Sequence, residues 1–307
     1  MKILNNILET IGNTPVVVLN RVTDGCPARI LAKLEMFNPS ASAKARAALG
    51  MILEAEESGV LKPGSVIVEP TSGNQGIALA MVGAVRGYRV TVVMPESMSV
   101  ERRMLAEAYG AEVILTPKEG SVAGAVKKAR EIVAATRNAW MPDQFANPAN
   151  PRFHEKTTAM EILTQVDGPI HALVAGVGTG GTLTGIARAL KKYYPGLKVY
   201  AVEPENSAVL AGKPPGEHML EGIGDGFVPA NLDMSLVEAP VAVSDQEAVL
   251  MTRRLACEEG ILAGISSGAA VAAAVRVGRE MGRGKTVVVV LPDTGERYLS
   301  TPVFRKR

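Results

Sequence analysis

The stretch SVIVEPTSGNQGIALAMVGAV, residues 65–85, contains the pattern on which the fold prediction depends. Residues 65–70 form a short apolar run rich in β-branched side chains, which is typical of a buried strand. Residues 77–85 are apolar throughout and indicate a buried helix. Between them, TSGNQG at 71–76 offers more hydrogen-bonding groups than a turn and a helix cap require. The carboxyl end of a strand that leads into a helix in this way is a common ligand-binding position.

Apolar runs of the same kind recur along the chain and alternate with helical patterns. This alternation is typical of buried, mainly parallel sheet and predicts the α/β class. A polar stretch at 141–153 predicts a crossing between two such units, and 211–233, which lacks periodicity, predicts a long functional loop. The strands are expected at residues 29–35, 65–70, 89–95, 111–117, 171–178, 198–204 and 286–293.

Composition narrows the classes of function. The chain has 307 residues, of which 47% are hydrophobic, and a formal net charge of only +2, so no basic surface argues for nucleic-acid binding. Cys26 and Cys257 are the only cysteines and lie outside any paired spacing, which predicts no metal site and suits a reducing cytoplasm. The first residues do not resemble a secretion signal, and no apolar segment has the length of a membrane span.

Two further glycine-rich turns follow predicted strands or precede predicted helices. GVGTGGTLTG at 176–185 supplies glycines for close approach and the hydroxyl groups of Thr179, Thr182 and Thr184, and it predicts a phosphate cradle. It lacks the GK[ST] of a P-loop, and a plain tight turn is the alternative. GISSGAAVAAA at 264–274 is most simply a capped helix packed against a sheet.

Lys44 lies in NPSASAKARAAL, residues 38–49, a turn of small residues that enters a helix. An average lysine is solvated and inert. A lysine at a helix start among small side chains can instead lose hydration near the positive end of the helix dipole. Both effects lower its pKa and favour Schiff-base chemistry.

Five motifs, in this order, closely resemble the cysteine synthase (O-acetylserine sulfhydrylase) family of fold-type-II pyridoxal-phosphate enzymes. They are NPSASAKAR at 38–46, EPTSGNQGIALA at 69–80, AGVGTGGTLTG at 175–185, EGIGDGFVPANLD at 221–233 and EGILAGISSGAAVAAA at 259–274. The resemblance implies a tryptophan-synthase-β-like fold with two open, twisted, mainly parallel sheets flanked by helices. It also implies a smaller mobile domain at 40–145 and a larger domain made of 1–39 and 146–307.

The resemblance assigns cofactor contacts to individual residues. Lys44 would form the internal aldimine with pyridoxal 5'-phosphate, Asn74 would hydrogen-bond the ring hydroxyl oxygen, and Ser266 would face the pyridine nitrogen. A neutral serine there makes the ring a weaker electron sink, which suits β-elimination. The phosphate would be held by Gly178, Thr179, Gly180, Gly181 and Thr182.

The same resemblance implies a substrate site and a reaction. The substrate carboxylate would be bound by Thr71, Ser72, Gly73, Gln75 and Gln144, and its burial would close the smaller domain. The reaction would form L-cysteine from O-acetyl-L-serine and sulfide through an α-aminoacrylate, with Lys44 moving the Cα proton. The family implies a homodimer, with the C-terminal tail of serine acetyltransferase as a further partner. His154, His171 and His218 have no role in this scheme.

Two residues depart from the family pattern. Gln75 replaces the second threonine of TSGNTG, and Asp225 stands where typical cysteine synthases carry a small apolar residue. Asp225 is either a solvated loop residue or a base that activates a second nucleophile. The second case favours a lyase that releases sulfide from cysteine, or a cystathionine- or lanthionine-type synthase. A catalytically silent relative has no need of Lys44, and a dehydrogenase is opposed by the missing GxGxxG after an N-terminal strand.

Overall fold

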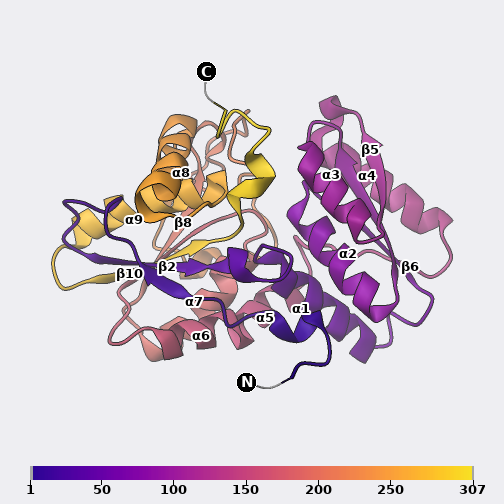
Figure 1. Ribbon diagram of the computed structural model, residues 1–307, viewed down its shortest axis with the longest axis horizontal. Helices are drawn as coiled ribbons and strands as arrows, with labels where there is room; N and C mark the ends of the chain where they lie inside the picture. Colours follow the sequence, from indigo (N-terminus) through magenta and orange to yellow (C-terminus); the bar gives the residue numbers. More distant parts are fainter. Residues whose placement is uncertain (1–2, 306–307) are drawn as a thin grey trace.

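The computed structural model describes residues 3–305 and contains two α/β bodies, each built on an open sheet (Figure 1). The larger sheet has the strand order β1-β2-β10-β7-β8-β9, and the smaller has the order β5-β4-β3-β6. Neighbouring strands are parallel throughout the described chain except for the antiparallel pair β1 and β2. The predicted class and the two mainly parallel sheets are therefore confirmed.

The strands are β1 (Val16–Val18), β2 (Arg29–Leu34), β3 (Val66–Pro70), β4 (Arg89–Pro95), β5 (Glu112–Thr116), β6 (Ala139–Trp140), β7 (Ala172–Gly176), β8 (Lys198–Pro204), β9 (Ala239–Val243) and β10 (Thr286–Leu291). The helices are α1 (Lys44–Glu57), α2 (Asn74–Arg86), α3 (Val100–Ala108), α4 (Ser121–Ala135), α5 (Ala149–Lys156), α6 (Thr158–Gln165), α7 (Gly181–Tyr193), α8 (Asp245–Glu259) and α9 (Ile265–Met281). No helix in the described chain is both long and apolar enough to cross a membrane.

All seven predicted strands are present, and the three that the sequence pattern missed are β1, β6 and β9. Each of the three lies at the edge of a sheet. β1 and β6 have only three and two residues, too few to show a period. β9 is only partly buried over most of its length and contains Pro240, a residue that is tolerated at sheet edges.

The larger sheet is covered by helices on both faces, and β10 shows how one strand serves two cores. Val287 and Val289 point into the core formed with α8 and α9, while Val288 and Val290 point into the core formed with α6 and α7. Successive side chains of a strand face opposite sides of the sheet. A continuous run of valines therefore suits a central strand that is buried on both faces.

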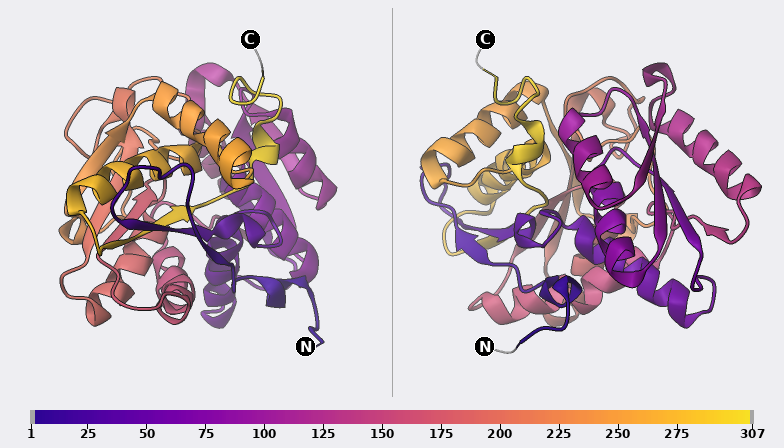
Figure 2. Two further views of the ribbon diagram at one scale, coloured as in Figure 1. Left: turned by 60° about the vertical axis from the view of Figure 1, so that its left-hand side comes forward. Right: turned by 45° about the vertical axis from the view of Figure 1, so that its right-hand side comes forward.

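The smaller sheet follows the same plan (Figure 2). On one face Ile67 and Val92 pack with residues of α1, α2 and α3, and on the other Val68 and Val93 pack with α4. Helix α1 also packs against α5 of the larger body, so it lies where the two bodies meet. The strands of this sheet fall within the predicted smaller domain at 40–145. The domain boundaries and the mobility of this domain remain predictions, and residues 1–2 and 306–307 lie outside the described residues.

The two irregular stretches connect or cover these bodies. Residues 141–148 lead from β6 to α5, so the crossing is shorter than predicted. The reason is local: the Asn147 side chain accepts the Ala149 N–H at 3.0 Å, which starts α5 inside the stretch predicted as irregular. Residues 211–233 contain no helix or strand, as predicted for a long loop.

Candidate active site

One cavity is lined by residues that follow one strand of the smaller sheet and two strands of the larger sheet, and it encloses about 540 Å³ of space, part of it open to solvent. It lies where β3, β7 and β10 deliver their carboxyl ends, the usual ligand position of open α/β sheets. Of the residues predicted for the site, the cavity is lined by Lys44, Thr71, Ser72, Asn74, Gln75, Gln144, Gly178, Thr179, Asp225 and Ser266. The others, Gly73, Gly180, Gly181 and Thr182, belong to the same turns but do not line it. The lining residues that the sequence did not predict are Arg102, Val122, Phe145, Gly222 and Pro292.

Lys44 is the first residue of α1, and the Ser42 hydroxyl accepts its backbone N–H at 3.3 Å. Burial lowers the pKa of the Lys44 amine, and the carboxylates of Asp225 and Asp293 act in the opposite direction. No side chain of the described residues hydrogen-bonds this amine. A lysine in these surroundings is available as a nucleophile and as a base.

Asn74 is held from both sides by residues of the C-terminal segment. Its amide nitrogen donates to Asp293 Oδ2 at 2.7 Å, and the guanidinium of Arg297 donates to its amide oxygen. Tyr298 donates its hydroxyl to the same Asp293 oxygen at 2.8 Å. These contacts fix the orientation of the amide and leave one of its N–H groups for a ligand. The sequence analysis did not assign Asp293 to the site. Its position at the end of the predicted strand 286–293, where open α/β sheets bind ligands, is the signal that could have identified it.

The turn at 71–76 contains a glycine in a backbone conformation that residues with a side chain rarely adopt. Gly73 has φ +143°, and a Cβ atom there would lie 2.3 Å from the Arg102 side chain, so only glycine fits. Thr71 accepts the Gly73 N–H at 3.0 Å. The amide nitrogen and oxygen of Gln75 are both buried, and neither has a hydrogen-bond partner among the described residues. Since buried polar groups are normally paired, these atoms are suited to a polar ligand such as a carboxylate.

Gln144 reaches the cavity because a buried carboxyl group holds its backbone. Glu69, at the end of β3, accepts the N–H groups of Asp143 and Gln144, each at 3.1 Å. Burial raises the pKa of Glu69 to about 8, although both hydrogen bonds act to lower it. Glu69 therefore links the turn after β3 to the crossing segment. This link was not predicted from the sequence.

The loop after β7 has the geometry of an anion cradle. Gly180, with φ +76°, precedes α7, whose first N–H groups face outward from the helix start. A Cβ on Gly178 would lie 2.3 Å from the Gly222 carbonyl oxygen, so the loop tolerates no larger residue there. The sequence predicted that the Thr184 hydroxyl belongs to the phosphate cradle. In the structure this hydroxyl instead accepts the Asp233 N–H at 3.0 Å and supports the 211–233 loop.

Asp225 lines the cavity together with Lys44, and its side chain is only partly exposed. Burial raises the pKa of its carboxyl, and Lys44 acts to lower it. The loop that carries it is stabilised by His218, whose Nε2 donates to the Gly224 carbonyl at 2.9 Å and whose Nδ1 accepts the Leu220 N–H at 3.1 Å. His171 lies elsewhere and accepts the Thr286 N–H at 3.1 Å.

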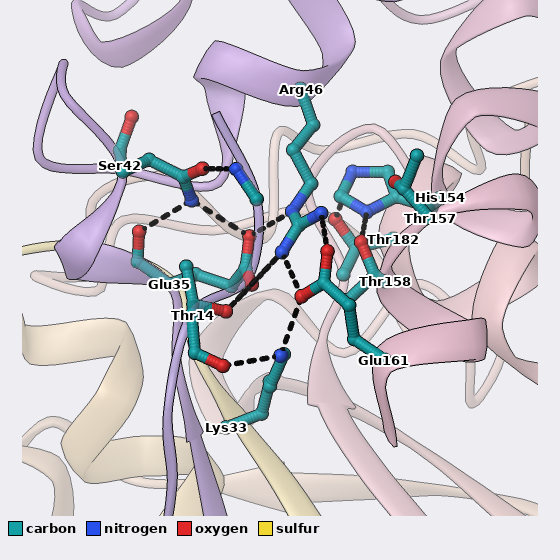
Figure 3. A network of polar contacts seen from close by, with 12 residues as sticks. Thr14, Lys33, Glu35, Ser42, Arg46, His154, Thr157, Thr158, Glu161 and Thr182 are labelled. Carbon is teal, nitrogen blue, oxygen red and sulfur yellow. Dashed lines mark hydrogen bonds and ion pairs between the residues drawn. The ribbon is translucent and has the colours of Figure 1, made fainter. Parts of the chain in front are cut away.

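An ion network lies beside the start of α1 (Figure 3). Arg46, which is fully buried, donates to Glu35 at 2.7 and 2.9 Å and to Glu161 at 2.6 and 2.7 Å. Lys33 donates to the same Glu161 at 2.7 Å. The network joins β2, α1 and α6, and it fixes the helix turn that presents Lys44.

Taken together, the described residues fit pyridoxal phosphate. The cavity offers an amine for an aldehyde carbon, a helix N-terminus with glycines for a phosphate, and an oriented amide for a ring substituent. It also offers the partner-free Gln75 amide for the carboxylate of an amino acid. In the described part of the chain, no group of three His, Cys, Asp or Glu side chains is arranged to hold a metal ion.

The chain matches the sequence profile described as "Pyridoxal-phosphate dependent enzyme" over residues 7–293. It is 53% identical over 304 residues to the cysteine synthase of Staphylococcus aureus (strain N315), covering 99% of this chain and 98% of that protein. The crystal structure of a cysteine synthase from Entamoeba histolytica superimposes with a TM-score of 0.95 at 44% identity, covering 100% of this chain and 92% of that one.

A hydrogen sulfide-producing enzyme from Fusobacterium nucleatum is also similar, with a TM-score of 0.94 at 41% identity. That match covers 97% of this chain and all of the other. From the profile match and the 53% identity, the chain belongs to the pyridoxal-phosphate-dependent enzymes, within the cysteine synthase family.

Proposed function

We propose that this protein forms L-cysteine from O-acetyl-L-serine and sulfide, with pyridoxal 5'-phosphate bound through Lys44. The observation that carries the proposal is one cavity lined by an amine of lowered pKa, by the glycine-containing loop that precedes α7, and by a buried amide without a hydrogen-bond partner among the described residues. The similarity to the cysteine synthase of S. aureus supports the choice of reaction. Cysteine formation from these two substrates, measured with the purified chain and its cofactor, tests it.

When bound, pyridoxal phosphate supplies a carbon that bonds the substrate amine and a conjugated ring that stabilises charge at Cα. The residues of the chain bind, orient and move a proton. Thr71, Ser72, Gln75 and Gln144 bind the substrate carboxylate and so direct the Cα–H bond toward Lys44. Lys44 takes that proton as the acetate group leaves and returns it after sulfide adds at Cβ.

Further residues hold the cofactor in this proposal. The phosphate lies against Gly178–Thr182 at the start of α7, Asn74 donates its remaining N–H to the ring oxygen, and Ser266 faces the ring nitrogen. The orientation of Asn74 follows from its bonds to Asp293 and Arg297. Gly73 contributes its positive φ, which shapes the substrate turn.

Replacing Ser72 with alanine is expected to raise the KM for O-acetyl-L-serine about tenfold or more, because a hydroxyl donor to a buried carboxylate is lost. The visible absorbance of the bound cofactor should not change. Ser267→Ala is a control for the loss of a hydroxyl group, since Ser267 is buried and does not line the cavity. Unchanged kinetics in Ser72→Ala would contradict the assigned carboxylate site.

A second function is favoured by the position of Asp225 in the cavity with Lys44. There its carboxylate can act as a base toward water, so that L-cysteine and water yield L-serine and hydrogen sulfide. The similarity to the sulfide-producing enzyme of F. nucleatum supports this candidate.

We expect the purified enzyme to release sulfide from cysteine alone and expect Asp225→Asn to lower that rate by about 10²-fold, the usual scale for loss of a general base. Asparagine keeps the size of the side chain and removes its basicity. Methylene-blue detection of sulfide measures the rate. No release by the unsubstituted enzyme would rule out this second function.

The resemblance also supports proposals about the oligomeric state, the partner protein and the cellular location. We propose a homodimer in the cytoplasm, a smaller domain at 40–145 that closes over bound substrate, and an interaction with the C-terminal tail of serine acetyltransferase. Light scattering of the purified chain tests the dimer. Titration with a peptide of the acetyltransferase tail tests the partner, and loss of binding in Ser72→Ala would place that peptide at the carboxylate site.

A further inference from the structure

Helix α5 approaches the start of α7 unusually closely. A Cβ atom on Gly181 would lie 2.2 Å from the Asn150 side chain, and one on Gly185 would lie 2.7 Å from His154 Cβ. The two glycines are therefore required for this helix contact. Asn150 and His154 are four residues apart, so they lie on the same face of α5, toward the loop proposed to hold the phosphate.

Asn150 donates to the hydroxyl oxygen of Thr179 at 3.1 Å. The same oxygen accepts the Gly181 N–H at 3.3 Å. A hydroxyl oxygen has two lone pairs and one proton, so both acceptor positions of Thr179 are used by the protein. The Thr179 hydroxyl lines the cavity and can act there only as a donor.

His154 lies between two threonine hydroxyls (Figure 3). Its Nδ1 is 2.8 Å from Thr158 Oγ1, and its Nε2 is 3.2 Å from Thr182 Oγ1. Burial lowers the pKa of His154 to about 3; nearby Glu35 and Glu161 act to raise it, and Arg46 and Lys44 add to the lowering. The ring is therefore neutral near pH 7, and only one of its nitrogens carries a proton.

The two tautomers have opposite consequences for Thr182. If Nδ1 carries the proton, the Thr182 hydroxyl must donate its proton to Nε2. Its oxygen then has only lone pairs, and no proton, available toward the phosphate. If Nε2 carries the proton, it donates to the Thr182 oxygen, and the Thr182 hydroxyl is free to donate. Phosphate oxygens accept hydrogen bonds, so a bound phosphate favours the second arrangement.

We propose that Asn150 and His154 are positioning residues that fix the direction of the hydrogen bonds at the phosphate site. Asn150 donates to Thr179 and His154 donates to Thr182, so that both threonine hydroxyl groups donate their protons to the cofactor phosphate. This inference rests on the proposed binding of pyridoxal phosphate. It assigns to His154 the Nε2-protonated tautomer, with Nδ1 accepting from Thr158. Neither residue contacts the reacting atoms.

The test compares two substitutions in protein stripped of cofactor. In His154→Gln, the amide N–H of glutamine can take the position of the histidine Nε2–H and donate to Thr182. In His154→Asn, the shorter amide reaches only the position of Nδ1, so the donor to Thr182 is lost. Dissociation constants are measured by fluorescence for pyridoxal phosphate and for pyridoxal, which lacks the phosphate. We expect His154→Asn to raise the dissociation constant for pyridoxal phosphate about tenfold, the scale of one hydrogen bond to a charged group. For His154→Gln we expect a rise of less than about threefold. Both variants should bind pyridoxal within about twofold of the unsubstituted chain, since the lost donor serves only the phosphate.

Equal losses in the two variants, or losses for pyridoxal as large as for its phosphate, would overturn the proposal because they indicate a purely structural role. A second measurement requires no variant: nitrogen-15 NMR of the histidine-labelled holoenzyme should show the proton of His154 on Nε2. A proton on Nδ1 would overturn the assignment even if the variants fail to fold. If the unsubstituted chain binds pyridoxal but gains nothing from the phosphate, this inference fails, whereas failure to bind either ligand contradicts the proposed function itself.

Discussion

Lys44→Ala is expected to lower the rate of cysteine formation by at least about 10³-fold, while the chain remains folded. Lys44 is the only lysine among the described residues that line the cavity. The substitution therefore removes both the proposed attachment point of the cofactor and the base for the Cα proton. The visible absorbance of the bound cofactor should disappear or shift. Sulfide-dependent cysteine formation and the absorbance spectrum measure the two effects on the same sample.

A matched control for this variant is Lys62→Ala, because Lys62 is exposed and does not line the cavity. Its activity should stay within about twofold of the unsubstituted enzyme, as is usual for surface substitutions. Far-ultraviolet circular dichroism of all three proteins shows whether the fold is kept. Substantial activity in a folded Lys44→Ala protein would contradict the role assigned to this lysine.

Arg46→Met is expected to lower the free energy of unfolding by about 3–5 kcal/mol, because it leaves the carboxylate of Glu35 buried without its cation. Glu35 and Arg46 are fully buried, and Glu161 also loses a partner. Urea denaturation of the cofactor-free protein measures the change. Arg152→Met is the control, since Arg152 pairs with Glu54 at the exposed surface, where such pairs contribute about 0–1 kcal/mol.

The same network predicts a dependence on pH. Burial acts to raise the pKa of Glu35, but the Arg46 guanidinium lowers it overall. Arg46, together with Lys33 and the Asn13 N–H, also lowers the pKa of Glu161 from 4.5 to about 2. A lowered folded-state pKa contributes stability above the unfolded value, and this contribution is lost as the pH falls through the folded value. The unsubstituted protein should therefore lose stability between pH 4.5 and about 2 more steeply than Arg46→Met. Parallel profiles for the two proteins would contradict this assignment.

Much of the fold could be predicted because its central strands are buried on both faces. Runs such as residues 286–291 consist almost entirely of β-branched residues, which is typical of such strands. The turns that follow β3 and β7 contain glycines at a strand-to-helix junction, which indicates a ligand-binding turn. β9 could not be predicted in the same way, because a partly buried edge strand with a proline lacks that pattern. The start of α5 was missed because an Asn147 side-chain contact, rather than periodicity, determines it.

The residues that support the site were harder to predict than those that line it. Arg46 and Glu161 are 115 positions apart, and Asn74 and Arg297 are 223 apart, so only the folded topology brings them together. Arg102 resembles an ordinary surface residue of α3 in the sequence, but it is buried and contacts the Ser72 carbonyl oxygen at 3.2 Å. Local patterns carry no information about such pairs.

The most direct test of the account is to reduce the cofactor-loaded protein with sodium borohydride and to map the modified peptide by mass spectrometry. Reduction makes the bond between a lysine and the cofactor aldehyde permanent. We predict one phosphopyridoxyl group per chain, on Lys44. A modification on any other lysine, or none on a protein saturated with pyridoxal phosphate, would contradict the central claim.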